Sequence, residues 1–222
     1  MKKIKYFTEE NKLQKIKQWK SELTSIYSDK KPFKFNPVKA ALLIVDMQLY
    51  FTDKKSHAYI PSSEVIFKPI LELKEKFHQL ELPVILTRYG LSDEIKKNSI
   101  MIDWWDGILK QSDPLADIDP LVKDDWSITI NKATYDSFYE TNLEEILQKQ
   151  QIEQIIIAGL VTHLCVESTA RNAFIRNYHV FLPIDCIASY NEEIHLSSLK
   201  AAAHGFGIPT TSQELLEKFE RG

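Results

Sequence analysis

The stretch Ala40-Ala-Leu-Leu-Ile-Val45 places six apolar residues in a row, with no polar residue to mark a side facing solvent. A strand of this kind is covered on both faces, as in a parallel sheet with helices above and below it. A second run, Gln154-Ile-Ile-Ile-Ala158, has the same character. The two runs predict the interior of an α/β fold.

Around these runs the sequence alternates between helical and extended patterns. We expect helices over residues 63–80, 141–149, 163–177 and 192–204 and from 211 onward, and further strands over 83–87, 126–130, 179–184 and near 208. The alternation predicts a Rossmann-like three-layer α/β/α sandwich with a mostly parallel sheet. In such a fold the ligand cleft lies beyond the carboxyl ends of the strands.

Residues 1–37 are expected to form an N-terminal helical extension to a single main domain over 38–222. Apolar residues recur in it at helical spacing among lysines, at Leu13, Ile16, Trp19, Leu23 and Ile26. An amphipathic helix of this kind buries its apolar side. We expect it either to cover the main core or to form a dimer contact.

Composition and charge narrow the class of protein. Of the 222 residues, 44% are hydrophobic and 27% are charged, which is typical of a globular chain. The net charge of −3 gives no basic surface for nucleic acid, and no segment approaches the roughly 18 apolar residues of a membrane helix. We therefore expect a cytoplasmic protein that acts on a small molecule, with neither nucleic acid nor membrane as partner.

Three reactive side chains are expected at one edge of the sheet. Asp46 and Lys132 each follow an expected strand, and Cys165 begins the helix after the strand over 154–158. Residues just past the carboxyl ends of parallel strands meet at the edge where ligands bind. The sequence therefore predicts that these three side chains share one site.

The chemistry of the three residue types favours nucleophilic catalysis. A cysteine at a helix N-terminus beside a lysine has a lowered thiol pKa, so Cys165 is expected to be a thiolate nucleophile. Asp46 would accept the thiol proton and return one to the leaving group, while Lys132 holds both anionic partners in place. Backbone N–H groups of the turn Gly159-Leu-Val-Thr162 are expected to stabilise an oxyanion. This arrangement predicts a substrate whose reacting atom is a carbonyl carbon.

The other cysteine and the histidines are given no part in this chemistry. Cys186 lacks comparable surroundings and is expected to be structural, and two cysteines favour a reducing compartment over a disulfide framework. His163 lies two residues from Cys165 at a helix start, so the two side chains diverge. The six histidines show no ligand spacing, so we expect no metal and no other cofactor.

Three motifs occur in a fixed order along the chain. Ala41-Leu-Leu-Ile-Val-Asp46-Met-Gln48-x-x-Phe51, then Lys132, then Gly159-Leu-Val-Thr162-His-Leu-Cys165 resemble the isochorismatase-like cysteine hydrolase superfamily from about residue 38 onward. The resemblance implies a hydrolase domain with the triad Asp46, Lys132 and Cys165, assembled as a homo-oligomer. It also implies a cis peptide bond between Val161 and Thr162, and an oxyanion hole formed by the N–H groups of Val161, Thr162 and Cys165.

Side chains near the triad are candidates for the wall of a substrate pocket. They are Gln48 and Phe51 of the first motif, with Arg88, Tyr89, Trp104, Trp105, Tyr135 and Phe138 from later loops. Several of them fall in the long connection over residues 90–125, and so long a connection usually carries function.

The motifs favour a cysteine hydrolase of a small amide or carbamoyl substrate, acting through a covalent thioester. The first alternative is an isochorismatase, which cleaves a vinyl ether with Asp46 and without the thiol. The N-terminal extension and the segments Trp104-Trp105-Asp106-Gly107 and Tyr135-x-x-Phe138 are similar to true isochorismatases, although those enzymes generally lack a cysteine at position 165. Nicotinamidases carry an Asp/His metal cluster, for which Thr87-Arg-Tyr-Gly90 supplies no histidine. The second alternative is a non-catalytic binding protein on the same fold.

Overall fold

A seven-stranded sheet forms the centre of the molecule in the computed structural model, which describes residues 1–27, 33–92, 100–105, 107 and 109–220. The strand order is β3-β2-β1-β4-β5-β7, with β6 paired to β4, and each of these pairings is parallel. The strands are β1 (Ala40–Val45), β2 (Val84–Tyr89), β3 (Ile128–Lys132), β4 (Gln154–Leu160), β5 (His179–Pro183), β6 (Ile187–Ala188) and β7 (Ile208–Thr210).

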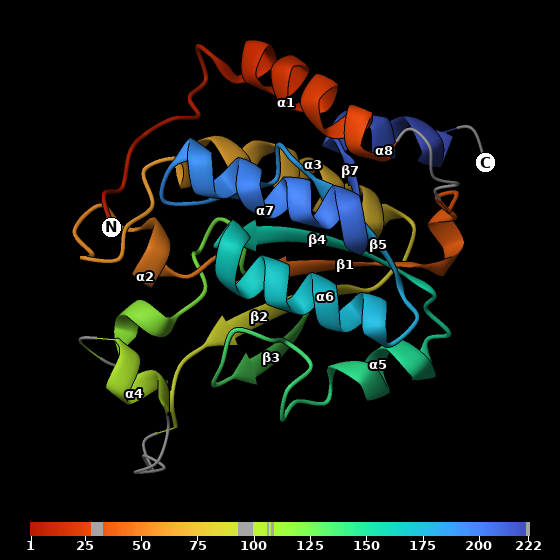
Figure 1. The fold of residues 1–222 in the computed structure, drawn as a ribbon. Helices are drawn as coiled ribbons and strands as arrows, with labels where there is room; N and C mark the ends of the chain where they lie inside the picture. The colour runs from red at the N-terminus through yellow and green to blue at the C-terminus, as the bar shows by residue number, and fades with distance from the viewer. Residues whose placement is uncertain (28–32, 93–99, 106, 108, 221–222) are drawn as a thin grey trace.

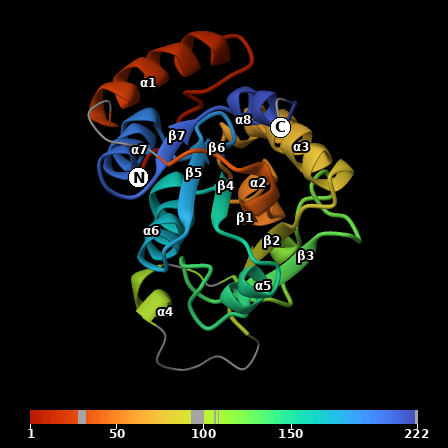
Figure 2. The same cartoon turned by 90° about the vertical axis from the view of Figure 1, so that its right-hand side faces the viewer.

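Helices cover both faces of this sheet, which confirms the three-layer α/β sandwich. Helices α3 and α8 pack together on one face, and α6 and α7 pack together on the other (Figure 2). The helices are α1 (Lys12–Tyr27), α2 (Leu49–Thr52), α3 (Ser63–Gln79), α4 (Ile100–Trp104), α5 (Leu143–Lys149), α6 (Glu167–Ile175), α7 (Glu192–Gly205) and α8 (Ser212–Glu220). Short turns of other helix types span Pro37–Lys39, Pro114–Ala116 and Thr162–Val166.

The two central strands carry the core. Every residue of β1 and of β4 is buried, as expected for strands with helices on both faces. Helix α1 packs on α7, and its residues Trp19 and Leu23 are fully buried in the same core. The helix thus covers the main body, which is the first of the two alternatives for this segment.

Strand order fixes where a ligand site can form. The chain runs from β1 outward to β2 and β3, and then returns to the other side of β1 to form β4 and β5. The carboxyl ends of β1 and β4 are therefore neighbours at the point where the winding direction reverses, which is the usual ligand position in such sheets. Figure 1 shows these ends on the left, beside α2 and the N-terminus.

Some elements differ from the sequence-based expectation. Strand β3 spans Ile128–Lys132 rather than 126–130, which makes Lys132 the last strand residue instead of a loop residue. The short elements α2, α4 and β6 were not expected from the sequence pattern, because elements of two to five residues carry too little periodicity.

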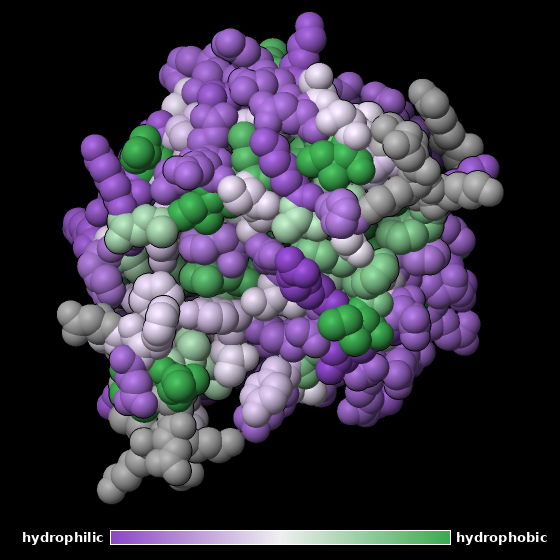
Figure 3. All heavy atoms as spheres, viewed as in Figure 1, coloured by the Kyte–Doolittle hydropathy of each residue, from purple (hydrophilic) through white to green (hydrophobic). Residues whose placement is uncertain are grey.

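The surface in the view of Figure 3 is mostly hydrophilic, with apolar side chains in separate small patches. None of the helices in the described part of the chain is both long and apolar enough to cross a bilayer.

Candidate active site

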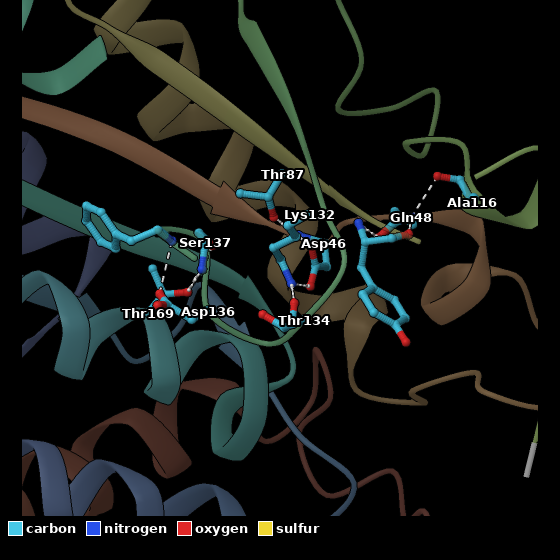
Figure 4. A network of polar contacts seen from close by, with 11 residues as sticks. Asp46, Gln48, Thr87, Ala116, Lys132, Thr134, Asp136, Ser137 and Thr169 are labelled. Atoms are coloured by element: carbon cyan, nitrogen blue, oxygen red, sulfur yellow. Dashed lines mark hydrogen bonds and ion pairs between the residues drawn. The ribbon is translucent and has the colours of Figure 1, made fainter. Parts of the chain in front are cut away.

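A buried ion pair lies at the carboxyl edge of the sheet. Asp46 Oδ2 is 2.7 Å from Lys132 Nζ, and both side chains are fully buried. Thr87 of β2, the strand between β1 and β3, donates its hydroxyl to Asp46 Oδ1 at 2.6 Å and accepts the backbone N–H of Asp46 at 3.0 Å. Figure 4 shows Asp46 between Thr87 and Lys132. Three adjacent strands therefore hold this carboxylate in one orientation.

The two oxygens of Asp46 have different partners. Oδ1 accepts a hydrogen bond from Thr87, whereas Oδ2 faces Lys132 Nζ at 2.7 Å. Lys132 also donates to the carbonyl oxygen of Thr134 at 2.8 Å. The backbone of Asp46 is left-handed, with φ of 49°, a strained conformation for a non-glycine residue that is common at functional sites.

Cys165 lies beside this pair, in the helical turn Thr162–Val166 that leads into α6. Its side chain is 4% exposed and lines a cavity. Burial raises the pKa of the thiol well above its ordinary value; Lys132 acts to lower it and Asp46 to raise it further. Burial therefore favours the neutral thiol and opposes the expected resting thiolate, while Lys132 acts in the other direction. The resting thiolate stays a prediction.

The charge on Lys132 is retained in spite of burial. Burial disfavours an ammonium ion, but the attraction of Asp46 and of Cys165 outweighs it and raises the pKa of Lys132. Lys132 thus remains a cation beside Asp46 and Cys165.

The turn after β4 differs from the expected geometry in one bond. The cis peptide joins Leu160 to Val161, one residue before the expected Val161–Thr162 bond. Of the three residues expected to form an oxyanion hole, Val161 and Cys165 line the cavity, whereas Thr162 does not. The Thr162 hydroxyl instead hydrogen-bonds Nδ1 of the buried His195 at 2.9 Å.

The cavity that Cys165 lines has a volume of about 210 Å³ and a wall made mainly of aromatic and aliphatic side chains. Four of the expected pocket residues line it: Phe51, Tyr89, Trp105 and Tyr135. Trp105 and Tyr135 are joined by a hydrogen bond of 2.6 Å from the indole N–H to the phenol oxygen. Sequence reasoning missed several wall residues that come from separate segments: Met1, Lys3, Tyr50, His57, Ala58, Met101, Gly107, Leu109, Leu164 and Tyr190.

Four other expected pocket residues lie outside this wall. Gln48 is fully buried and bonds the backbone of Tyr89 and of Ala116 (Figure 4). Arg88 donates to the carbonyl oxygen of Gln111 and to Asp117.

The remaining two of these four are aromatic. Trp104 is 75% exposed, on the outside of α4. Phe138 packs against Tyr178 and the guanidinium of Arg176. Asp106, in the expected loop Trp104-Trp105-Asp106-Gly107, lies outside the described residues.

The side chains given no catalytic part have other partners. Cys186 is fully buried. His163 is directed to Ser189, with 2.7 Å between Nδ1 and the hydroxyl oxygen. Across the described ranges, no three His, Cys, Asp or Glu side chains come together as a metal site. The expectation of a protein without metal or cofactor stays a prediction.

Comparison with known proteins defines the class. The family model described as the Isochorismatase domain matches residues 40–214. The chain is 30% identical to Nicotinamidase 3 of Arabidopsis thaliana, over 75% of this chain and 82% of that protein. It is also 30% identical to Enterobactin synthase component B of Escherichia coli strain K12, over 88% of this chain and 68% of that protein.

A solved structure is similar as well. The cysteine hydrolase from Pseudomonas syringae pv. phaseolicola 1448A superposes with a TM-score of 0.82 at 26% identity, covering 86% of this chain and 99% of that one. With the family model matched over most of the chain, the protein belongs to the isochorismatase family. It is a hydrolase of that family.

Proposed function

We propose that the protein hydrolyses a small amide or carbamoyl compound through a thioester on Cys165. The observation that carries the proposal is the buried ion pair between Asp46 and Lys132, which acts directly on a thiol that lines a cavity. A carboxylate that interacts with the thiol while paired with a lysine is a suitable base for it. The aromatic wall and small volume suit a small organic substrate.

The reaction then proceeds in two halves. The thiol proton passes to Asp46 Oδ2 as Sγ attacks the carbonyl carbon, and the N–H groups of Val161 and Cys165 are candidate donors to the oxyanion. Asp46 returns the proton to the departing nitrogen, and an amine or ammonia leaves with the thioester formed. Water then attacks the thioester, Asp46 accepts its proton, and the departing sulfur takes that proton back as the acid product forms. Lys132 holds Asp46 in position through both halves.

A second candidate is vinyl ether cleavage at the same site, as in an isochorismatase. Burial that favours a neutral thiol is compatible with it, because this reaction makes no use of Cys165. Asp46 would then protonate or activate the vinyl ether of the substrate itself.

Substitution of Cys165 separates the two reactions. A panel of small amides and isochorismate is assayed with the parent protein, with Cys165→Ala and with Asp46→Asn. The proposal expects both variants to lose more than roughly 100-fold in amide hydrolysis, and rapid quench with mass spectrometry to detect an acyl group on Cys165.

The buried Cys186 provides the matched control, because Cys186→Ala removes a thiol without changing the site. A Cys165→Ala variant as active as the parent on its best substrate would overturn the proposal in favour of ether cleavage. We also keep the expectation of a cytoplasmic homo-oligomer, whose size sedimentation can measure.

A further inference from the structure

The N-terminal arm, residues 1–7, reaches the cavity from outside the matched family domain. Ile4 donates its backbone N–H to the Tyr190 carbonyl oxygen at 2.7 Å, and the Tyr6 hydroxyl accepts the backbone N–H of Ser189 at 2.9 Å. Phe7 is buried in the core. Figure 1 shows the arm in red, descending from α1 to the carboxyl edge of the sheet beside α2. The arm is thus anchored at several points, and its residues Met1 and Lys3 line the cavity.

Lys3 brings a positive charge to this wall. Its ammonium donates to the carbonyl oxygen of His57 at 2.6 Å and lies 5.4 Å from the centre of the Tyr190 ring. No carboxylate of the described residues is within ion-pair distance of it. Burial lowers the pKa of Lys3, and no neighbouring anion opposes that effect. The partly buried side chain gains no counter-charge from the described residues, and its ammonium has one protein acceptor among them, the carbonyl oxygen of His57.

The other described residues of the cavity wall carry little charge. No aspartate or glutamate is among the described residues that line the cavity, and the basic side chains there are Lys3 and His57. The remaining wall is mainly aromatic and aliphatic. Among the described lining residues, an anionic group therefore meets Lys3 with no carboxylate beside it, and Asp46 is outside this lining and paired with Lys132.

We infer that Lys3 is a specificity-determining residue that binds a carboxylate on the substrate, so that the protein selects small amides carrying a carboxylate away from the scissile carbonyl. This inference rests on the proposed function for its reaction, but it concerns binding and can be tested without turnover. The arm makes selectivity a property of residues 1–7, which precede the family domain at 40–214.

The test compares matched pairs of compounds that differ by one carboxylate: succinamate with butyramide, and 3-carbamoylbenzoate with benzamide. The variants are Lys3→Met, which keeps the aliphatic stem, Lys3→Arg, which keeps the charge, and Lys2→Met as an exposed control on the same arm. Affinities are measured by calorimetry in the Cys165→Ala background, and kcat and KM are measured in the parent background.

The anionic member of at least one pair should bind on the order of tenfold more tightly or better, the size expected for a charge-assisted hydrogen bond. Lys3→Met should remove this preference and raise KM with little change in kcat. Lys3→Arg should keep most of it, and Lys2→Met should leave it unchanged.

Two results would overturn the inference: no preference for the anionic member in either pair, or a preference that survives in Lys3→Met. A failure of the proposed function looks different. In that case the Cys165→Ala protein turns over substrate, while the binding preference still depends on Lys3.

Discussion

Gly159 lies opposite Val45 in the register of β4 and β1, closer than any residue with a side chain could come. A Cβ atom at Gly159 would stand 2.0 Å from the Val45 carbonyl oxygen, and the glycine has a φ of 105°. Val45 immediately precedes Asp46, and Gly159 precedes the turn to Cys165. This close approach brings the two reactive side chains to one site.

Gly159→Ala is therefore expected to lower the free energy of unfolding by about 3 kcal/mol or more, from the sum of left-handed backbone strain and overpacking. Chemical denaturation measures it. The matched control is Gly205→Ala at the end of α7, where nothing lies within 4 Å of the added atom. That control should range from neutral to about 1 kcal/mol more stable. Equal effects in the two variants would contradict the role given to the close approach.

Removing one member of the buried ion pair should be costly for stability. Lys132→Met leaves the Asp46 carboxylate buried without a counter-charge, a loss of about 3–5 kcal/mol. The double variant Asp46→Asn with Lys132→Met removes both charges and should recover a large part of that loss. Urea unfolding of the single and double variants measures the coupling. Strict additivity of the two substitutions would show that the charges do not stabilise each other.

His195 should make stability depend on pH. Burial lowers its pKa to about 3, and its Nε2 has no partner among the described residues. The unfolded chain binds a proton near pH 6.5 but the folded protein does not, so between about 6.5 and 3 the free energy of unfolding falls on acidification. The slope from this one group is about 1.4 kcal/mol per pH unit.

Unfolding curves from pH 7 to 4.5 test this slope against His195→Gln, which should lose it. His204→Gln, an exposed histidine on the same helix α7, is the control and should keep it. If His195→Gln follows the same pH profile as the parent protein, the buried neutral histidine is not the source.

The two cysteines should differ in alkylation. Cys165 lines the cavity whereas Cys186 is fully buried, so iodoacetamide should label Cys165 first in the folded protein. Because burial raises the thiol pKa, labelling should be slow at neutral pH and should still accelerate above about pH 8.5, the ordinary thiol value. Peptide mapping across the pH range measures both expectations. A rate that reaches its plateau below that value would indicate a thiolate at rest.

The sequence was sufficient for the fold because its strongest signals were long ones. The apolar runs in β1 and β4 have one interpretation, and the position of Asp46 and Cys165 past their ends follows from strand order. The charge state of Cys165 did not follow, because it depends on depth of burial, which sequence spacing does not give.

The cavity wall was harder to predict from the sequence than the positions of Asp46 and Cys165. Thr87, the partner of Asp46, sits inside a strand where threonine is common for its β-propensity alone. Tyr50, Tyr190 and Lys3 come from three segments that meet only in the folded chain. The N-terminal lysines carry no pattern that distinguishes Lys3 from Lys2.

The position of the N-terminal arm also has a practical consequence for work with the protein. A purification tag or surface linker fused ahead of Met1 would emerge at the mouth of the cavity, because Met1 is part of its wall. Such a fusion would obstruct substrate entry and disturb Lys3. The resulting change in selectivity would resemble the effect of a substitution at Lys3. Helix α8 ends on the opposite side of the molecule (Figure 1), so attachment there leaves the entrance open. Kinetic comparisons between variants are best made with protein tagged at that end.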